Sequence, residues 1–120
     1  MSEKNAEPSE EVQLVRLFEI AKGLVRRGWA REVLARNRRG EPVAPVASDA
    51  TRFCADGALL RAGRDMEAPY GLYELARRLV TATLRKRKGA GHLTSYNDRF
   101  ARRREDICTL FDEAAEPFRK

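Results

Sequence analysis

Residues 10–28 read EEVQLVRLFEIAKGLVRRG, and this stretch decides how the rest of the chain is interpreted. Its apolar residues recur at the spacing i, i+3, i+4, i+7, which places them on one face of an α-helix. Ser9 precedes the stretch as a candidate N-cap, and the two glutamates that follow it suit the positive end of the helix dipole. Gly28 is a natural stop signal. We therefore predict a helix that buries Leu14, Leu17, Phe18, Ala21, Leu24 and Val25.

The length of 120 residues is typical of one domain, and an apolar content of 42% is sufficient for a single core. We expect a flexible tail over residues 1–8 and a single helical domain over residues 9–118. No apolar run approaches the roughly 20 residues that a membrane-spanning helix needs. The N-terminus lacks the layout of a secretory signal, which predicts a cytoplasmic protein in which Cys54 and Cys108 are free thiols.

The same helical spacing recurs further along the chain, so the predicted fold class is all-α, a compact bundle of about four to five helices. The expected segments after the first helix are residues 29–35, 48–63, 72–83 and 102–115, with Pro117 ending the last. Residues 37–45 are expected to be a loop, and residues 85–91 a basic break. We expect a core of Leu14, Leu17, Phe18, Leu24, Trp29, Phe53, Ala58, Leu75, Leu79, Ile107, Leu110 and Phe111.

Gly57 lies inside the second of these later segments, where a glycine costs about 1 kcal/mol relative to alanine. A glycine kept at such a position favours the close approach of another element. We expect that element to be a crossing helix.

Three short motifs follow one another in the chain, namely Gly28-Trp29-Ala30, the segment CADGAL at residues 54–59, and YNDR at residues 96–99. In their order and spacing, the chain resembles a family of small bacterial and phage proteins catalogued as a domain of unknown function. The likeness spans roughly residues 14–115. It implies a shared fold and no particular chemistry. Two basic segments, residues 85–88 and 101–104, depart from the family pattern.

The inventory of reactive residues argues against an enzyme, a metal site or a cofactor. The single histidine, His92, and the two distant cysteines do not have the spacing of metal ligands. A remote alternative is a small enzyme that uses Cys54, or the pair Asn97 and Asp98. We expect Cys54 to be a buried, inert thiol, and we expect the Asn97–Asp98 pair to form a polar turn, with ligand binding as its alternative role.

Basic residues are the remaining functional lead, because 24 Lys and Arg face 18 Asp and Glu, giving a net charge of +6. The run Arg102–Arg104 starts a predicted helix. The helix dipole disfavours cations at that end, and an external anion would offset this unfavourable interaction. We predict a non-enzymatic binding or adaptor protein that contacts a protein or an acidic polymer, with no membrane partner. A nucleic-acid-binding protein is the alternative. The partner-binding residues would be Arg85, Lys86, Arg87, Lys88, Arg102, Arg103 and Arg104.

Overall fold

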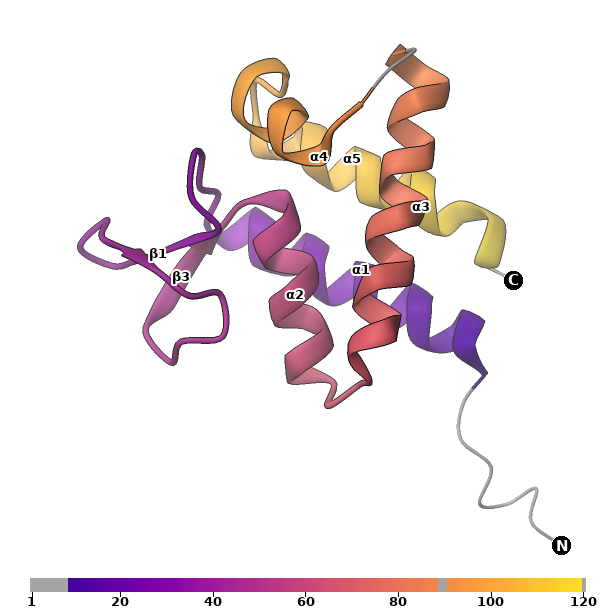
Figure 1. Cartoon of the computed structure of the whole chain (residues 1–120), viewed down its shortest axis with the longest axis horizontal. Coiled ribbons are helices and arrows are strands. Elements are labelled where there is room, and N and C mark those ends of the chain that lie inside the picture. The colour runs from indigo at the N-terminus through magenta and orange to yellow at the C-terminus, as the bar shows by residue number, and fades with distance from the viewer. Residues whose placement is uncertain (1–8, 89–90, 120) are drawn as a thin grey trace, which may run out of the picture.

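The computed structural model describes residues 9–88 and 91–119, so the predicted tail over residues 1–8 lies outside the described residues. Helices surround a core and a small sheet lies at one end of the molecule (Figure 1). The helical elements are α1 (Glu10–Arg27), α2 (Ala55–Asp65), α3 (Tyr70–Lys88), α4 (Leu93–Ser95), the π-helical turn η2 (Tyr96–Phe100), α5 (Arg104–Ala115) and the 3-10 turn η3 (Glu116–Phe118). The strands are β1 (Ala35–Asn37), β2 (Pro42–Val43) and β3 (Ala50–Phe53).

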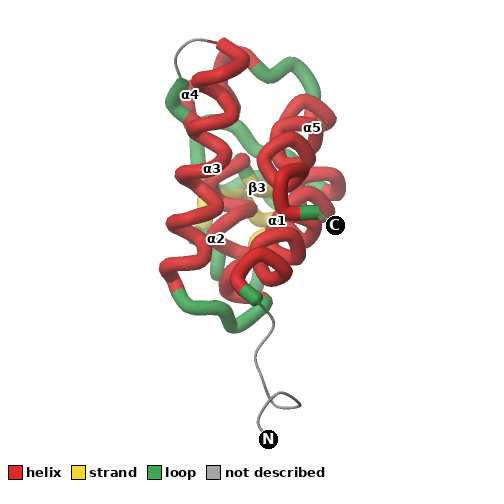
Figure 2. The backbone as a smooth tube through the Cα atoms, turned by 90° about the vertical axis from the view of Figure 1, so that its right-hand side faces the viewer, coloured by secondary structure: helices red, strands yellow, loops and turns green. Residues whose placement is uncertain are grey.

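Helix α1 forms as its sequence predicts. The Oγ of Ser9 accepts the N–H of Val12 at 3.2 Å, and the helix ends at Gly28. The apolar face of α1 packs against α2, α3 and α5, and the rings of Phe18 and Phe111 lie 6.0 Å apart. Figure 2 looks along the molecule from the end opposite the sheet, with the strands behind the helices. None of the helices in the described ranges is both long and apolar enough to cross a membrane.

The small antiparallel sheet corrects the all-α prediction. Its strand order is β2-β1-β3, and Ala35 in the central strand pairs with Val43 on one side and Phe53 on the other. Residues 29–35 do not form the predicted helix, because Trp29 pairs with Phe53 in a parallel bridge before β1 begins. The N–H of Ala30 donates to the carbonyl of Phe53 at 3.1 Å.

The start of α2 is also different from the prediction. Residues 50–53 pair as β3, so α2 begins at Ala55 with Cys54 as its N-cap, and not at residue 48. Gly57 does approach another segment closely, but that segment is not a helix. A Cβ built on Gly57 would lie 2.1 Å from the carbonyl oxygen of Leu34, just before β1.

Two further boundaries differ at the C-terminal half. Helix α3 continues through Lys88, so the predicted break over residues 85–91 is wrong for its first four residues, and residues 89–90 lie outside the described ranges. Helix α5 begins at Arg104 and ends at Ala115, two residues later at its start than predicted. The predicted core is confirmed as fully buried at Leu14, Leu17, Phe18, Phe53, Ala58, Ile107, Leu110 and Phe111. Leu24, Trp29, Leu75 and Leu79 are partly buried against it.

Candidate functional site

The three motifs noted in the sequence meet at the fully buried side chain of Asn97. Its Oδ1 accepts hydrogen bonds from Trp29 Nε1 at 2.8 Å and from the N–H of Ala55 at 2.9 Å. Its Nδ2 donates to the carbonyl of Ala30 at 3.0 Å and to Asp98 Oδ1 at 2.9 Å. An amide side chain has two donors and an oxygen with two lone pairs, so its hydrogen-bonding capacity is filled. Asn97 therefore joins three distant segments and has no group left for a ligand.

Asp98 extends this network to the segment between α1 and β1. Its Oδ1 also accepts the N–H of Glu32 at 2.9 Å. Glu32 has a φ of 72°, in the left-handed region that residues other than glycine rarely adopt. The hydrogen bond helps to hold that conformation. The side chains of Asn97 and Asp98 are thus both engaged within the fold.

Cys54 has the environment of a structural residue. It is 4% exposed, and its Sγ accepts the N–H of Gly57 at 3.3 Å, which caps α2. Burial raises the pKa of the Cys54 thiol to about 11. At neutral pH the thiol is therefore protonated and a poor nucleophile. His92, the single histidine, lines a hollow to which Cys54 does not contribute.

The residues of the Arg102–Arg104 run make two kinds of contact within the fold. The backbone N–H groups of Arg102 and Arg103 donate to Asp106 Oδ2 at 2.8 and 3.2 Å, and these bonds lower the pKa of the Asp106 carboxyl. The guanidinium of Arg104 donates to the carbonyl of Arg26 at 2.7 Å, at the C-terminal end of α1. A cation is favoured at that end of a helix. Asp106 and the C-terminal end of α1 thus offset part of the unfavourable dipole interaction, a role that we predicted for an external anion.

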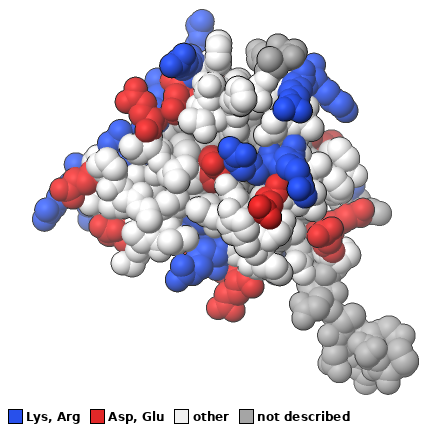
Figure 3. Space-filling view, in the orientation of Figure 1, with Lys and Arg blue, Asp and Glu red and all other residues white. Residues whose placement is uncertain are grey.

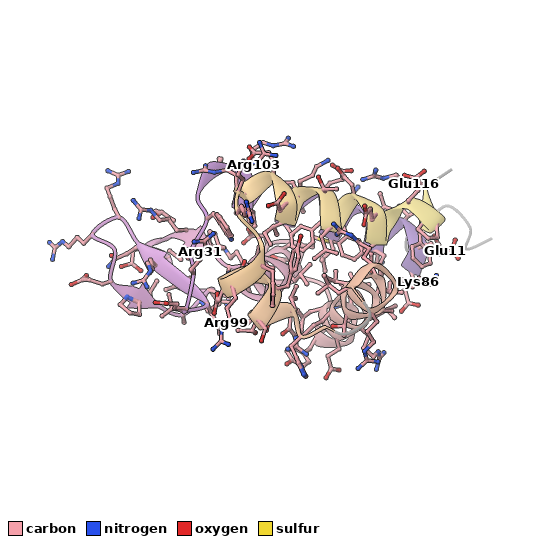
Figure 4. All side chains as sticks on the ribbon, turned by 90° about the horizontal axis from the view of Figure 1, so that it is seen from above. Glu11, Arg31, Lys86, Arg99, Arg103 and Glu116 are labelled. Atoms are coloured by element: carbon pink, nitrogen blue, oxygen red, sulfur yellow. The ribbon has the colours of Figure 1, made fainter. Side chains whose placement is uncertain are left out.

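The Arg85–Lys88 run forms the last turn of α3. Arg87 is paired with Glu113 at 3.3 Å. Arg85 and Lys86 are exposed, and the side chain of Lys88 lies outside the described part of the structure. Most of the two runs lie apart from each other. Lys86 and Arg103 lie on separate parts of the molecule, with Arg103 on the half that carries the sheet (Figure 4).

Basic and acidic side chains are interspersed over the face of the molecule that Figure 3 shows, so charge alone does not define a binding surface there. The structure instead gathers arginines from separate segments around one hollow of about 450 Å³ beside β1 and β3. We call this the arginine hollow. Its lining includes Trp29, Arg31, Glu32, Arg36, Arg52 and Arg102.

Two of these guanidinium groups are held in place by neutral partners. Arg31 donates to the carbonyl of Ala101 at 2.7 Å, and its guanidinium carbon lies 4.5 Å from the centre of the Trp29 ring. Arg36 donates to the carbonyl of Gly40 at 2.8 Å and to that of Arg31 at 3.3 Å. Carbonyl and ring contacts orient a guanidinium without neutralising its charge, and each group retains unused donors.

The arginines of the hollow also make no ion pair with the described residues. In the part of the chain that the structure describes, ion pairs within 4.0 Å involve Lys22, Arg61, Arg77, Arg87 and Arg119. None of the four arginines of the hollow is among them. Glu32 lines the hollow but makes no ion pair of this length. The hollow is a shallow concave site in which four arginines accompany one glutamate.

A second hollow, of about 710 Å³, adjoins the first because Arg102 lines both. We call it the aromatic hollow. Tyr96 and the exposed ring of Phe100 contribute to it, and so do Arg87 and His92. One residue from each predicted basic run, Arg87 and Arg102, thus reaches the same site. Among residues 9–88 and 91–119, no group of three His, Cys, Asp or Glu side chains could hold a metal ion.

Sequence reasoning missed the arginine hollow because its members come from four separate segments. These arginines do not form a dense run in the sequence. Arg36 and Arg52 are paired across β1 and β3, and Arg31 is held by the carbonyl of Ala101. A usable signal was the excess of basic over acidic residues between positions 26 and 52, where seven arginines accompany three carboxylates. Without the sheet, nothing brings those arginines to the same side.

Asn97 joins the segments that carry the three sequence motifs, so the residues of these motifs hold the fold together. A family model described as a family of unknown function (DUF6197) matches residues 10–117, nearly the whole chain. The chain belongs to this family. Membership of DUF6197 confirms the resemblance to a domain of unknown function and brings no activity with it. No curated protein and no solved structure matches the chain.

Proposed function

We propose that this member of DUF6197 is a non-enzymatic binding protein that holds an anionic partner in the arginine hollow. The observation that carries the proposal is the set of four arginines, Arg31, Arg36, Arg52 and Arg102, around one concave site without an ion pair to any carboxylate in the described residues. Guanidinium groups bind carboxylates and phosphates through paired, charge-assisted hydrogen bonds. The partner would present one of these two groups.

Preorganisation supports this proposal. Arg31 and Arg36 are already oriented by carbonyl oxygens and by the Trp29 ring, so binding an anion would cost them little side-chain entropy. Arg52 and Arg102 are exposed and make no side-chain hydrogen bond or ion pair within the described residues, which leaves their donors free to adapt to the partner. A hollow that combines two fixed and two adaptable arginines suits a polymeric partner with several charges.

The non-enzymatic part of the proposal rests on the reactive groups that the fold engages elsewhere. Burial keeps the thiol of Cys54 protonated, and Asn97 uses its full hydrogen-bonding capacity inside the fold. The arginines of the hollow are suited to hold an anion, and they supply neither a general base nor a nucleophile at neutral pH.

The test compares two double variants that remove the same charge from different places. Arg52→Gln with Arg102→Gln alters the arginine hollow, and Arg16→Gln with Arg64→Gln removes two exposed arginines from α1 and α2 as the control. Fluorescent poly-glutamate and a 20-nucleotide oligothymidylate serve as carboxylate and phosphate probes. We expect the wild type to bind at least one probe, and the hollow variant to bind it about tenfold or more weakly, because two charge-assisted contacts are lost.

Melting temperatures of the two variants and the wild type should agree within a few degrees, since the substituted side chains are exposed. Equal weakening by both double variants would show diffuse attraction to the net positive charge and would contradict the proposal. Binding of neither probe by the wild type would also contradict it.

A further inference from the structure

We infer that the anionic partner is a single-stranded nucleic acid, with a base stacked on Phe100 in the aromatic hollow and the adjoining phosphates on Arg102 and the arginine hollow. This inference rests on the proposed function and names its partner. It draws on a second observation besides the arginines, which is an exposed aromatic ring that lines the adjoining hollow.

Phe100 is 67% exposed, the most exposed of the large hydrophobic residues in the described ranges. A single exposed hydrophobic side chain is ordinary on a protein surface. Tyr70 also lines a hollow with two arginines, but Asp56 and Glu74 line that hollow too. Phe100 differs from the other exposed hydrophobic residues because its hollow shares Arg102 with the arginine hollow.

In the aromatic hollow, Arg87 is paired with Glu113, and Asp106 also lines the hollow. Arg102 is thus its arginine without an ion pair in the described residues. An apolar ring beside that charge suits a ligand that is both aromatic and anionic.

The backbone around Phe100 is anchored on both sides. The N–H of Ala101 donates to the carbonyl of Tyr96 at 2.8 Å, which closes the π-helical turn η2. Ala101 is buried, and its carbonyl holds the guanidinium of Arg31. Asn97, in the same turn, is the buried link described above. The backbone that carries Phe100 is therefore held by hydrogen bonds on both sides, so stacking on the ring would require little ordering of the main chain.

The two hollows together match the chemistry of a single strand better than that of an acidic protein or of a duplex. Single strands are bound by aromatic rings that stack on bases and by basic grooves that follow the backbone. A duplex keeps the faces of its bases inside its own stack, so it could use the arginines and not Phe100. An acidic protein would likewise use the arginines and could bury the Phe100 ring against an apolar side chain, whereas a nucleobase would cover the ring with a flat aromatic face next to a phosphate.

The experiment measures binding of the full chain to three probes of similar length: a 20-nucleotide oligothymidylate, a 20-base-pair duplex and poly-glutamate. Phe100→Leu keeps an apolar side chain but removes the stacking surface, and Phe100→Trp enlarges it. Tyr70→Leu removes a ring that is 63% exposed at the start of α3 and serves as the control. Loss of one stacked base should weaken oligothymidylate binding by about 5- to 100-fold. Phe100→Trp and Tyr70→Leu should bind it as well as the wild type.

The inference and the proposed function fail in different ways. The inference is overturned if the duplex or poly-glutamate binds as tightly as the oligothymidylate, or if Phe100→Leu leaves oligothymidylate binding unchanged. The proposed function still stands in either case, provided that Arg52→Gln with Arg102→Gln weakens binding of the preferred probe. If the wild type binds none of the three probes, both are overturned. A preference for the single strand that is lost in Phe100→Leu and kept in Tyr70→Leu supports the inference.

Discussion

Asn97 is the single residue on which the arrangement of the candidate site most depends, because its amide joins the segments that carry Trp29 and Ala55 to η2. We predict that Asn97→Asp lowers the free energy of unfolding by about 3 kcal/mol or more, since it removes both side-chain donors and buries a carboxylate beside Asp98. Urea denaturation measures this. Asp98→Asn keeps an oxygen for the N–H of Glu32 and should cost about 1 kcal/mol or less. A near-neutral Asn97→Asp would contradict the structural role of this side chain.

Cys54 permits a prediction about pH. Burial raises its pKa to about 11 in the folded state from an ordinary value of 9.0, so its contribution to stability is complete below about pH 9 and is lost as pH rises towards 11. Serine does not titrate in this range and is a good N-cap. The stability difference between the wild type and Cys54→Ser should therefore shift against the wild type by about 2 kcal/mol between pH 8 and pH 11. A constant difference, measured by denaturation at each pH, would show that the thiol is not desolvated.

At the scale of elements, the close approach of α2 to the segment before β1 depends on Gly57. We predict that Gly57→Ala is destabilising by about 2 kcal/mol or more, although alanine favours helices, because its Cβ would lie 2.1 Å from a backbone oxygen of Leu34. Gly23→Ala in α1 is the matched control. Its nearest neighbour would be the side chain of Arg27 at 3.5 Å, so it should stabilise the protein by about 0.5–1 kcal/mol. Thermal unfolding of the two variants should give shifts of opposite sign, and a raised melting temperature for Gly57→Ala would contradict this packing.

The elements also show what the sequence could and could not predict. Helix α1 was predictable because an 18-residue element gives several turns of apolar spacing and has a cap at each end. The strands are two to four residues long, too short for an alternating pattern to be distinguished from a loop. The apolar pair Val33 and Leu34 therefore also fits a helical pattern, which explains the prediction of a helix over residues 29–35. The same reason explains why the arginine hollow was missed, since pairing of the short strands brings its arginines together.

At the scale of the whole molecule, the net charge of +6 was evident from the composition, but the location of unpaired charge was not. Ion pairs that join distant segments neutralise several basic residues, such as Lys22 with Asp112 and Arg77 with Asp56. Such pairing depends on the fold and leaves the arginines of the hollow uncompensated in the described residues. The structure therefore leads to a prediction that names four arginines around one hollow, whereas the sequence leads to one that names two separate basic runs.

The most direct test of the central claim is the salt dependence of oligothymidylate binding by the wild type and by Arg52→Gln with Arg102→Gln. Each phosphate contact on a single strand contributes about 0.7 to the slope of log K against log salt. If the two arginines each hold a phosphate, the slope should be less steep by about 1.4 in the double variant. The control Arg16→Gln with Arg64→Gln should keep the wild-type slope. A slope that is unchanged in the hollow variant, or reduced equally in both, would contradict the claim that the arginine hollow holds the partner.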